Sequence, residues 1–278
     1  GHIVMISNFK EYYRLVDYLS QYTKKQMALA MGVNSFVEIF DENGDAVERE
    51  VVESNITQDA SGKGDYRHYM LKEIYEQPLA VRNTLEGRLN DDRVAIDAFG
   101  DSAQQIFKDV KHVQIIACGT SYHSGMVARY WLEQFAGVSC NVEIASEFRY
   151  RDPIIFQDDI IIAISQSGET ADTLAAIKIA KERGAFVYGV CNVVGSSISR
   201  MTDTGCYTHA GPEIGVASTK AFTTQITVFS LLALHLGMLK GSLSRSEYQQ
   251  HLAELESLPD QVSEILKQET LIKEVASS

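Results

Sequence analysis

Cysteine is scarce in this sequence and shows no pairing pattern. The 278 residues contain 4 cysteines, none in a CxxC pair or at a His/Cys spacing typical of metal ligands. Such cysteine usage indicates a reducing compartment and argues against a structural zinc site. We therefore expect a cytoplasmic protein that needs neither a metal nor another cofactor. The four cysteines are Cys118, Cys140, Cys191 and Cys206.

Positively charged residues are fewer than negatively charged ones, and long apolar segments are absent from the sequence. The chain has 25 Lys and Arg against 37 Asp and Glu, and its net charge of −12 argues against a nucleic-acid-binding surface. No apolar run reaches the roughly 18 residues of a membrane span, and no signal peptide is visible. The hydrophobic content of 45% and charged content of 22% are typical of a protein with an ample core. We expect a soluble protein with no nucleic-acid or membrane partner.

Short apolar runs alternate with helical segments in the second part of the chain. This alternation predicts an α/β fold, in which helices flank an open parallel sheet on both faces. The predicted strands are residues 113–117, 141–145, 160–164, 186–191 and 205–209. The predicted helices are residues 103–110, 124–135, 169–180, 196–200 and 218–239, followed by an amphipathic helical tail at 244–278.

The first part of the chain has a different pattern. We predict an N-terminal region at residues 1–64, and the flanked sheet then falls in a domain at residues 65–278. Residues 66–85 have helical spacing, although Pro78 is expected to kink or interrupt that helix. Residues 87–102 are predicted to be irregular. The N-terminal region is predicted to hold a helix at 8–31, strands at 36–40 and 46–52 around a turn at 41–44, and a linker at 55–64.

A turn rich in hydroxyl groups follows the apolar strand predicted at residues 160–164. Ser165, Ser167 and Thr170 place three hydroxyls within six residues, just before a predicted helix. A strand, a turn and a helix in this order point free backbone N–H groups at an anion. An ordinary capped turn has the same composition, since serine and threonine are common N-cap residues.

A similar turn at residues 118–121 follows the strand predicted at 113–117. It supplies Thr120 and Ser121 as further candidate donors. In an open parallel sheet, ligands bind beyond the carboxyl ends of the strands at a topological switch point. Two such turns that converge on one crevice would form a phosphate site. The alternative role of Thr120 and Ser121 is helix capping.

The hydroxyl-rich turn resembles a known sequence motif. SQSGET at residues 165–170 resembles the motif of a sugar isomerase (SIS) domain. Four longer motifs narrow the resemblance to the glucosamine-6-phosphate synthase family, over residues 36–278. They are YRHYMLKEIYEQP at 66–78, CGTS at 118–121, EIASEFRYR at 143–151 and EIGVASTKAFTTQ at 213–225. The resemblance implies an SIS-type sheet.

The resemblance also implies a function and a set of contacts. The family converts fructose 6-phosphate and glutamine to glucosamine 6-phosphate and glutamate. It implies that one of these sugar phosphates binds here, and that the chain forms a homo-oligomer in which a neighbouring subunit completes the site. The family's sugar-phosphate contacts map onto Ser165, Gln166, Ser167, Thr170, Thr120 and Ser121, and its contacts near the sugar onto Val216 and Ser218.

Two parts of the family's sequence are missing. The chain has no N-terminal nucleophilic cysteine of a glutaminase half, and no second SIS half, which supplies the base for isomerisation in the family. We therefore expect the sugar-phosphate-binding part of an amidotransferase, inactive alone and truncated to its first SIS half. The alternatives are a stand-alone sugar-phosphate isomerase and a sugar-phosphate-sensing regulator.

No general base is assigned. Glu169 is the carboxylate nearest to the turn and Glu213 a weaker candidate base, with an acidic residue favoured at a helix start as the alternative role of Glu169. Lys220 is a candidate contact to a carbonyl or phosphate, with a solvated lysine at a helix start as its alternative.

Overall fold

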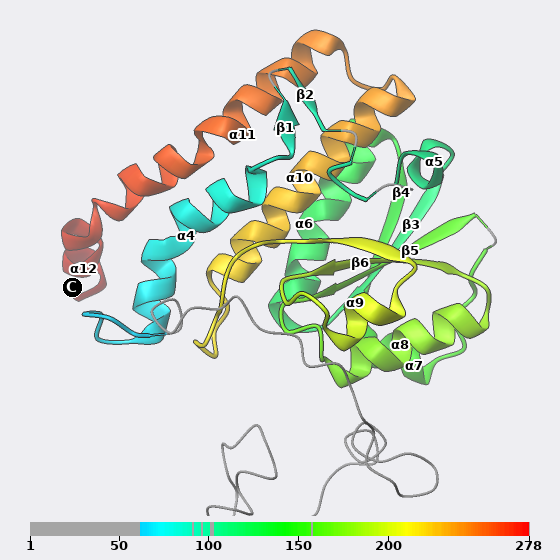
Figure 1. Ribbon diagram of the computed structural model, residues 1–278, viewed down its shortest axis with the longest axis horizontal. Coiled ribbons are helices and arrows are strands. Elements are labelled where there is room, and N and C mark those ends of the chain that lie inside the picture. The colour runs from blue at the N-terminus through cyan, green and yellow to red at the C-terminus, as the bar shows by residue number, and fades with distance from the viewer. Residues whose placement is uncertain (1–61, 91, 96, 101–102, 157, 278) are drawn as a thin grey trace, which may run out of the picture. The chain divides into compact units, whose positions relative to one another are not determined.

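The fold is built around a five-stranded parallel sheet in the order β4-β3-β5-β6-β7 (Figure 1). The structure is a computed structural model that describes residues 62–90, 92–95, 97–100, 103–156 and 158–277, and every described element belongs to one compact unit. All pairs of neighbouring strands in this sheet are parallel, which confirms the predicted α/β fold. The strands are β3 (His112–Ala117), β4 (Ser139–Ile144), β5 (Asp159–Ser165), β6 (Phe186–Cys191) and β7 (Thr204–Tyr207).

Helices cover both faces of the sheet. The three central strands, β3, β5 and β6, are buried on both sides, so they form nearly continuous apolar runs whose side chains alternate between two cores. In β5, Ile160 and Ile162 face the first core, whereas Ile161 faces the second. The first core is covered by α6 (Gly119–Ala136) and α10 (Lys220–Lys240), with α4 (Tyr69–Leu85), α5 (Ala103–Lys108) and α11 (Arg245–Leu266) around them. The second core is covered by α7 (Ala145–Tyr150), α8 (Ala171–Glu182) and α9 (Ser197–Met201).

Helix α6 lies directly on the sheet because it has a glycine at the contact. A Cβ atom at Gly125 would be 2.8 Å from Ile115 Cγ2 and 3.0 Å from Val142 Cγ1, closer than side chains tolerate. On its other side α6 packs against α10 (Figure 1). Helix α6 is therefore held between the sheet and α10.

Helix α10 is the longest apolar helix in the described part of the chain. By length and composition alone it could cross a membrane, but 67% of its apolar window is buried within the fold. It packs between α6, α4 and α11, where Phe229, Leu232 and Leu236 are fully buried. This environment is that of a core helix.

Several predicted boundaries were wrong. Residues 118–121 do not form a turn, because α6 begins at Gly119 and contains Thr120 and Ser121 in its first turn. Residues 145–150 form the helix α7, which was not predicted. Residues 87–102 are not wholly irregular, because they contain the short antiparallel pair β1 (Leu89–Asn90) and β2 (Arg93–Val94). The helical tail is divided into α11 and α12 (Glu269–Ser277).

Other predictions concern the helix at Pro78 and the N-terminal region. Helix α4 runs without interruption from Tyr69 to Leu85 with Pro78 inside it, so the proline does not end it. The predicted helix at 8–31, the strands and turn at 36–52 and most of the linker at 55–64 lie outside the described residues.

A buried histidine on α10 should make the stability depend on pH. The side chain of His235 is 7% exposed, its ring centroid is 5.6 Å from that of Phe99, and its Nε2 has no hydrogen-bond partner among the described residues. Burial lowers the pKa of this imidazole below 6.5. The unfolded chain therefore binds this proton more readily than the folded chain. As the pH is lowered from 6.5 toward the folded-state pKa, we expect the free energy of unfolding to fall by up to about 1.4 kcal/mol per pH unit.

The variant His235→Leu tests this expectation. Leucine neither titrates nor leaves a buried ring nitrogen unpaired, so the variant should lose less stability than the wild type when the pH is lowered from about 7 to about 5.5. Thermal denaturation of both proteins across this range measures the difference. Parallel stability curves for the two proteins would contradict the expectation.

Candidate functional site

The two hydroxyl-bearing segments lie at the topological switch point of the sheet. From β3 the chain crosses to β4 on one side, and β5 is added on the other side of β3. Strands β3 and β5 are paired in parallel, with Ile116 opposite Ala163, so their carboxyl ends lie next to each other. Ser165 is the last residue of β5, and Thr120 and Ser121 follow β3. The crevice beyond a switch point is where open α/β sheets bind their ligands.

The turn after β5 is organised by its own hydroxyl groups. Ser165 Oγ, in a residue that is 2% exposed, accepts a hydrogen bond from Gly168 N at 3.0 Å and lies 3.0 Å from Thr170 Oγ1. The exposed Ser167 accepts from Glu169 N at 3.2 Å through its Oγ. Gln166 stands between these serines and is partly exposed. Ser165, Gln166, Ser167 and Thr170 are thus gathered in one tight turn.

Gly168 fits this turn because it has no side chain. Its φ of 69° lies in the left-handed region, which side chains disfavour. A Cβ atom there would be 2.0 Å from Ser196 Oγ, and Gly168 O accepts a hydrogen bond from Ile198 N at 2.9 Å. The turn therefore docks tightly against the start of α9.

Glu169 has a structural partner in the same contact. Its Oε1 accepts a hydrogen bond from Ser197 N at 2.8 Å, at the beginning of α9. The carboxylate was expected either to act as a base or to favour the start of its own helix. Instead, α8 begins two residues later, at Ala171, and the carboxylate binds the neighbouring helix.

The first turn of α6 contains the second pair of predicted contacts. Thr120 is exposed, whereas Ser121 is 7% exposed and its Oγ accepts a hydrogen bond from Gln225 Nε2 at 3.0 Å. The Oε1 of the same glutamine accepts from Ser124 Oγ at 2.9 Å. Because Ser121 Oγ acts here as an acceptor, its own O–H is left to donate to a ligand.

Helices α6 and α10 run in the same direction, so their N-terminal parts lie side by side at this edge of the sheet. Gln225, near the start of α10, contacts Ser121, whereas a Cβ atom at Gly237, near the end of α10, would lie 2.7 Å from Phe135 O. The N-termini of α6, α8 and α10 therefore lie at the carboxyl edge of the parallel strands (Figure 1). Helix N-termini favour negative charge.

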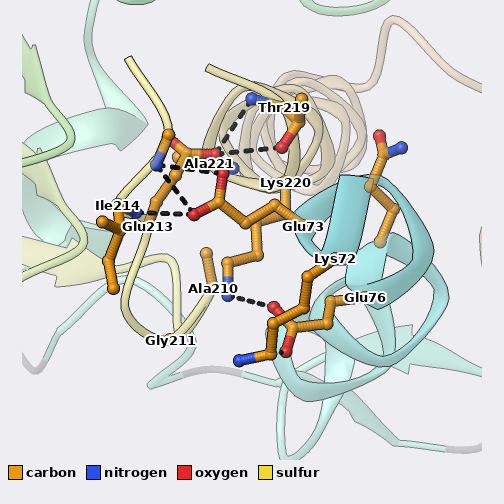
Figure 2. A network of polar contacts seen from close by, with 12 residues as sticks. Lys72, Glu73, Glu76, Ala210, Gly211, Glu213, Ile214, Thr219, Lys220 and Ala221 are labelled. Carbon is orange, nitrogen blue, oxygen red and sulfur yellow. Dashed lines mark hydrogen bonds and ion pairs between the residues drawn. The ribbon is translucent and has the colours of Figure 1, made fainter. Parts of the chain in front are cut away.

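The loop at residues 210–219, between β7 and α10, carries the remaining predicted contacts. The side chain of Val216 is fully exposed. Ser218 Oγ donates to Glu213 Oε2 at 3.0 Å, and Glu213 Oε1 accepts from Thr219 N at 2.9 Å and Ala221 N at 3.1 Å (Figure 2). Glu213 therefore caps α10. Its carboxylate, a candidate base from the sequence, is engaged in these hydrogen bonds.

Lys220 is occupied in a similar way. It is 3% exposed, and its Nζ lies 2.7 Å from Glu76 Oε2, while Glu76 Oε1 is 3.1 Å from Lys72 Nζ. Figure 2 shows these side chains of α4 reaching the start of α10. The lysine, a candidate contact to a carbonyl or phosphate, is thus buried and paired with a partly exposed carboxylate.

The arrangement at the switch point is suited to an anion held by neutral donors. The N-cap positions of α6 and α8 are Cys118 and Thr170, and neither side chain accepts a hydrogen bond from its helix. First-turn N–H groups at both helix starts are therefore not used by a side-chain cap. The acidic residue in the first turn of α8, Asp172, is paired with Arg149 at 2.7 Å. Within the described residues, no group of three or more His, Cys, Asp or Glu side chains is placed to hold a metal ion.

Two residues that organise this region were not among the predicted contacts. Gln225 links α10 to Ser121, and its amide within a largely apolar helix is the available sequence signal. Glu73 of α4 accepts hydrogen bonds from the loop at 210–219, and no local pattern singles it out among the charged residues of its helix.

Comparison with known proteins identifies the matching family and close relatives. The SIS domain family model matches residues 106–235. The chain is 55% identical over 241 residues to glutamine–fructose-6-phosphate aminotransferase (isomerizing) of Idiomarina loihiensis. Its sequence identity to the same enzyme of Shewanella oneidensis is also 55% over 241 residues. These alignments cover 86% of this chain but 39% of each relative, so the chain spans about two-fifths of their length.

A solved structure of a related aminotransferase is also similar to this chain. The C-terminal domain of glucosamine-fructose-6-phosphate aminotransferase from Francisella tularensis is similar to this chain, with a TM-score of 0.75 and 45% sequence identity. The match covers 77% of this chain and 60% of that domain. The structural similarity therefore extends over about three quarters of this chain.

Proposed function

We propose that this chain binds a hexose 6-phosphate at the switch point, as the first SIS half of a glutamine–fructose-6-phosphate aminotransferase. The match of residues 106–235 to the SIS domain family model and the similarity to these aminotransferases support the proposal. The observation that carries the proposal is the meeting of the turn at 165–170 with the first turn of α6 beyond adjacent parallel strands. In the proposed site, the hydroxyls of this turn and free N–H groups of α6 and α8 hold the phosphate.

The proposal extends to the reaction and to the remaining contacts. The chain is the sugar-phosphate-binding part of an amidotransferase that makes glucosamine 6-phosphate from fructose 6-phosphate and glutamine, and it is inactive by itself. Val216 and Ser218 contact the sugar. We further propose that the chain is divided into an N-terminal region at residues 1–64 and a sugar-phosphate-binding domain at residues 65–278. The protein forms a homo-oligomer and is located in the cytoplasm.

Neutral donors set the expected affinity. About four hydrogen bonds at about 1 kcal/mol each correspond to a Kd on the order of 1 mM. A thermal shift experiment with fructose 6-phosphate at several millimolar concentrations should therefore raise the Tm of the chain. No increase in Tm at saturating concentrations of this ligand would contradict the proposed function.

Activity assays separate the proposal from a stand-alone isomerase. We expect stabilisation by fructose 6-phosphate without formation of glucosamine 6-phosphate from ammonia and without aldose–ketose interconversion. Interconversion by the chain alone would favour the stand-alone isomerase instead. Formation of glucosamine 6-phosphate would show that the chain is active by itself.

The variant Ser167→Ala tests the phosphate contacts. Ser167 is exposed and its Oγ accepts only a weak local bond from Glu169 N, so its loss should leave the fold intact. Losing one ligand hydrogen bond should weaken the affinity for fructose 6-phosphate about three- to tenfold, measured from the ligand dependence of Tm. Ser257→Ala is the control: Ser257 is a partly exposed serine on α11 whose Oγ donates to Glu254 O and accepts from Gln261 Nε2, both within its own helix, and the variant should bind as the wild type does. Unchanged binding by Ser167→Ala would remove this residue from the site.

A further inference from the structure

A buried carboxylate of α4 holds the loop that carries the proposed sugar contacts. Glu73 is 2% exposed, and its Oε1 accepts hydrogen bonds from Ile214 N at 2.6 Å and Gly215 N at 2.9 Å (Figure 2). Burying a carboxylate is costly unless hydrogen bonds replace its water. Bonds from N–H groups to an ionised acceptor are among the stronger hydrogen bonds in proteins. The contact therefore fixes the backbone of the loop to α4.

The loop has the shape that this contact requires. A Cβ atom at Gly215 would lie 2.5 Å from Glu73 Oε2, so the carboxylate reaches the backbone only because this residue is a glycine. The φ of Gly215 is not in the left-handed region, so the glycine serves the close approach rather than an unusual backbone.

Two carboxylates hold the loop on either side of its exposed residue. Glu73 binds residues 214 and 215, and Glu213 binds Thr219 and Ala221 at the start of α10. Val216 lies between these two anchors with its side chain in solvent. The position of residues 216–218 relative to α10 is therefore set jointly by Glu73 and Glu213.

We propose that Glu73 is a positioning residue for the sugar end of the site. This inference rests on the proposed function, in which Val216 and Ser218 contact the sugar and the turn at 165–170 holds the phosphate. Glu73 bonds to the loop that carries Val216 and Ser218, whereas the hydrogen bonds of the turn at 165–170 go to its own residues, to α8 and to α9. Its loss should impair recognition of the sugar while recognition of the phosphate is kept.

The experiment compares two ligands on the full chain. Calorimetric titration with fructose 6-phosphate and with inorganic phosphate gives both affinities for the wild type, Glu73→Ala and Glu73→Gln. For Glu73→Ala we expect the affinity for fructose 6-phosphate to fall about tenfold, with the affinity for inorganic phosphate within about twofold of wild type. Glu73→Gln keeps an oxygen at the same place and should retain most of the affinity for fructose 6-phosphate.

Two further variants separate positioning from stability. Val81→Ala removes a fully buried side chain from the same helix without touching the loop, so it should lower Tm and leave both affinities unchanged. Gly215→Ala pushes the loop away from the carboxylate and should show the same ligand-specific loss as Glu73→Ala, and it serves as the test if Glu73→Ala does not fold. In a Glu73→Ala background the same glycine substitution should add little, because the clash is gone.

The outcomes distinguish this inference from the proposed function. If the wild type binds neither ligand, the proposed function fails and the inference fails with it. If the wild type binds fructose 6-phosphate and the folded Glu73→Ala or Gly215→Ala variant binds it equally well, the inference alone is wrong. An equal loss of affinity for both ligands would also overturn it, since that result indicates a general loss of structure.

Discussion

Replacing Gly168 with alanine should abolish measurable binding of fructose 6-phosphate and destabilise the fold. The left-handed backbone alone costs a non-glycine residue about 1–2 kcal/mol. The new Cβ would also lie 2.0 Å from Ser196 Oγ and 2.3 Å from Ser196 Cβ, and relieving such an overlap costs about 1–3 kcal/mol. The turn can relieve it only by moving away from α9, which displaces the proposed phosphate donors Ser165 and Ser167.

Gly184→Ala is the matched control for this variant. Gly184 has a φ of 79°, and nothing lies within 4 Å of a Cβ built on it. Its replacement should cost only the backbone penalty of about 1–2 kcal/mol and leave ligand binding unchanged. Denaturation of both variants and thermal shifts with fructose 6-phosphate provide the measurement. A Gly168→Ala protein that binds the ligand like the control would refute the proposed geometry of the turn.

Replacing Gln225 with methionine should give the second large effect. The glutamine is 2% exposed and bridges Ser121 Oγ and Ser124 Oγ, so it joins the N-terminal parts of α6 and α10. Methionine has a similar size but cannot form either bond, and Ser121 Oγ would lose its buried donor. We expect a loss of about 2–3 kcal/mol in the free energy of unfolding, seen as a fall in Tm of roughly 5 °C.

The same substitution should weaken ligand binding through Ser121. Without its glutamine partner, this hydroxyl is free to rotate, and we expect the affinity for fructose 6-phosphate to fall several-fold, by about 1 kcal/mol. Thr224→Val is the control, since Thr224 is fully buried but bonds only within its own helix, to Ala221 O. If both variants had the same Tm and affinity, the link between α6 and α10 would have no special role.

The elements best predicted from the sequence are the buried strands. Residues 186–191 were predicted as a strand and form β6 with the same bounds, and β5 extends one residue beyond each end of its prediction. Continuous apolar runs bounded by polar residues produce this agreement, because both faces of a parallel strand are buried.

Helix starts at the candidate site were predicted less well. Helix α6 begins at Gly119, five residues before the predicted start, because its first turn is polar and small and has no apolar spacing. Helix α8 begins at Ala171, two residues after the predicted start, because Glu169 bonds to α9 instead. The energies that decide these ends come from neighbouring elements, which local spacing does not reveal.

The sequence by itself determined the five strands of the parallel sheet and the place of the hydroxyl-rich turn, since burial and turn chemistry depend on neighbouring residues. Only the tertiary structure decided that Gln225 meets Ser121 and that Glu73 holds the loop at 210–219. These partners are 104 and 141 residues apart in the chain. They meet because α10 packs against both α6 and α4, and no local pattern encodes that packing.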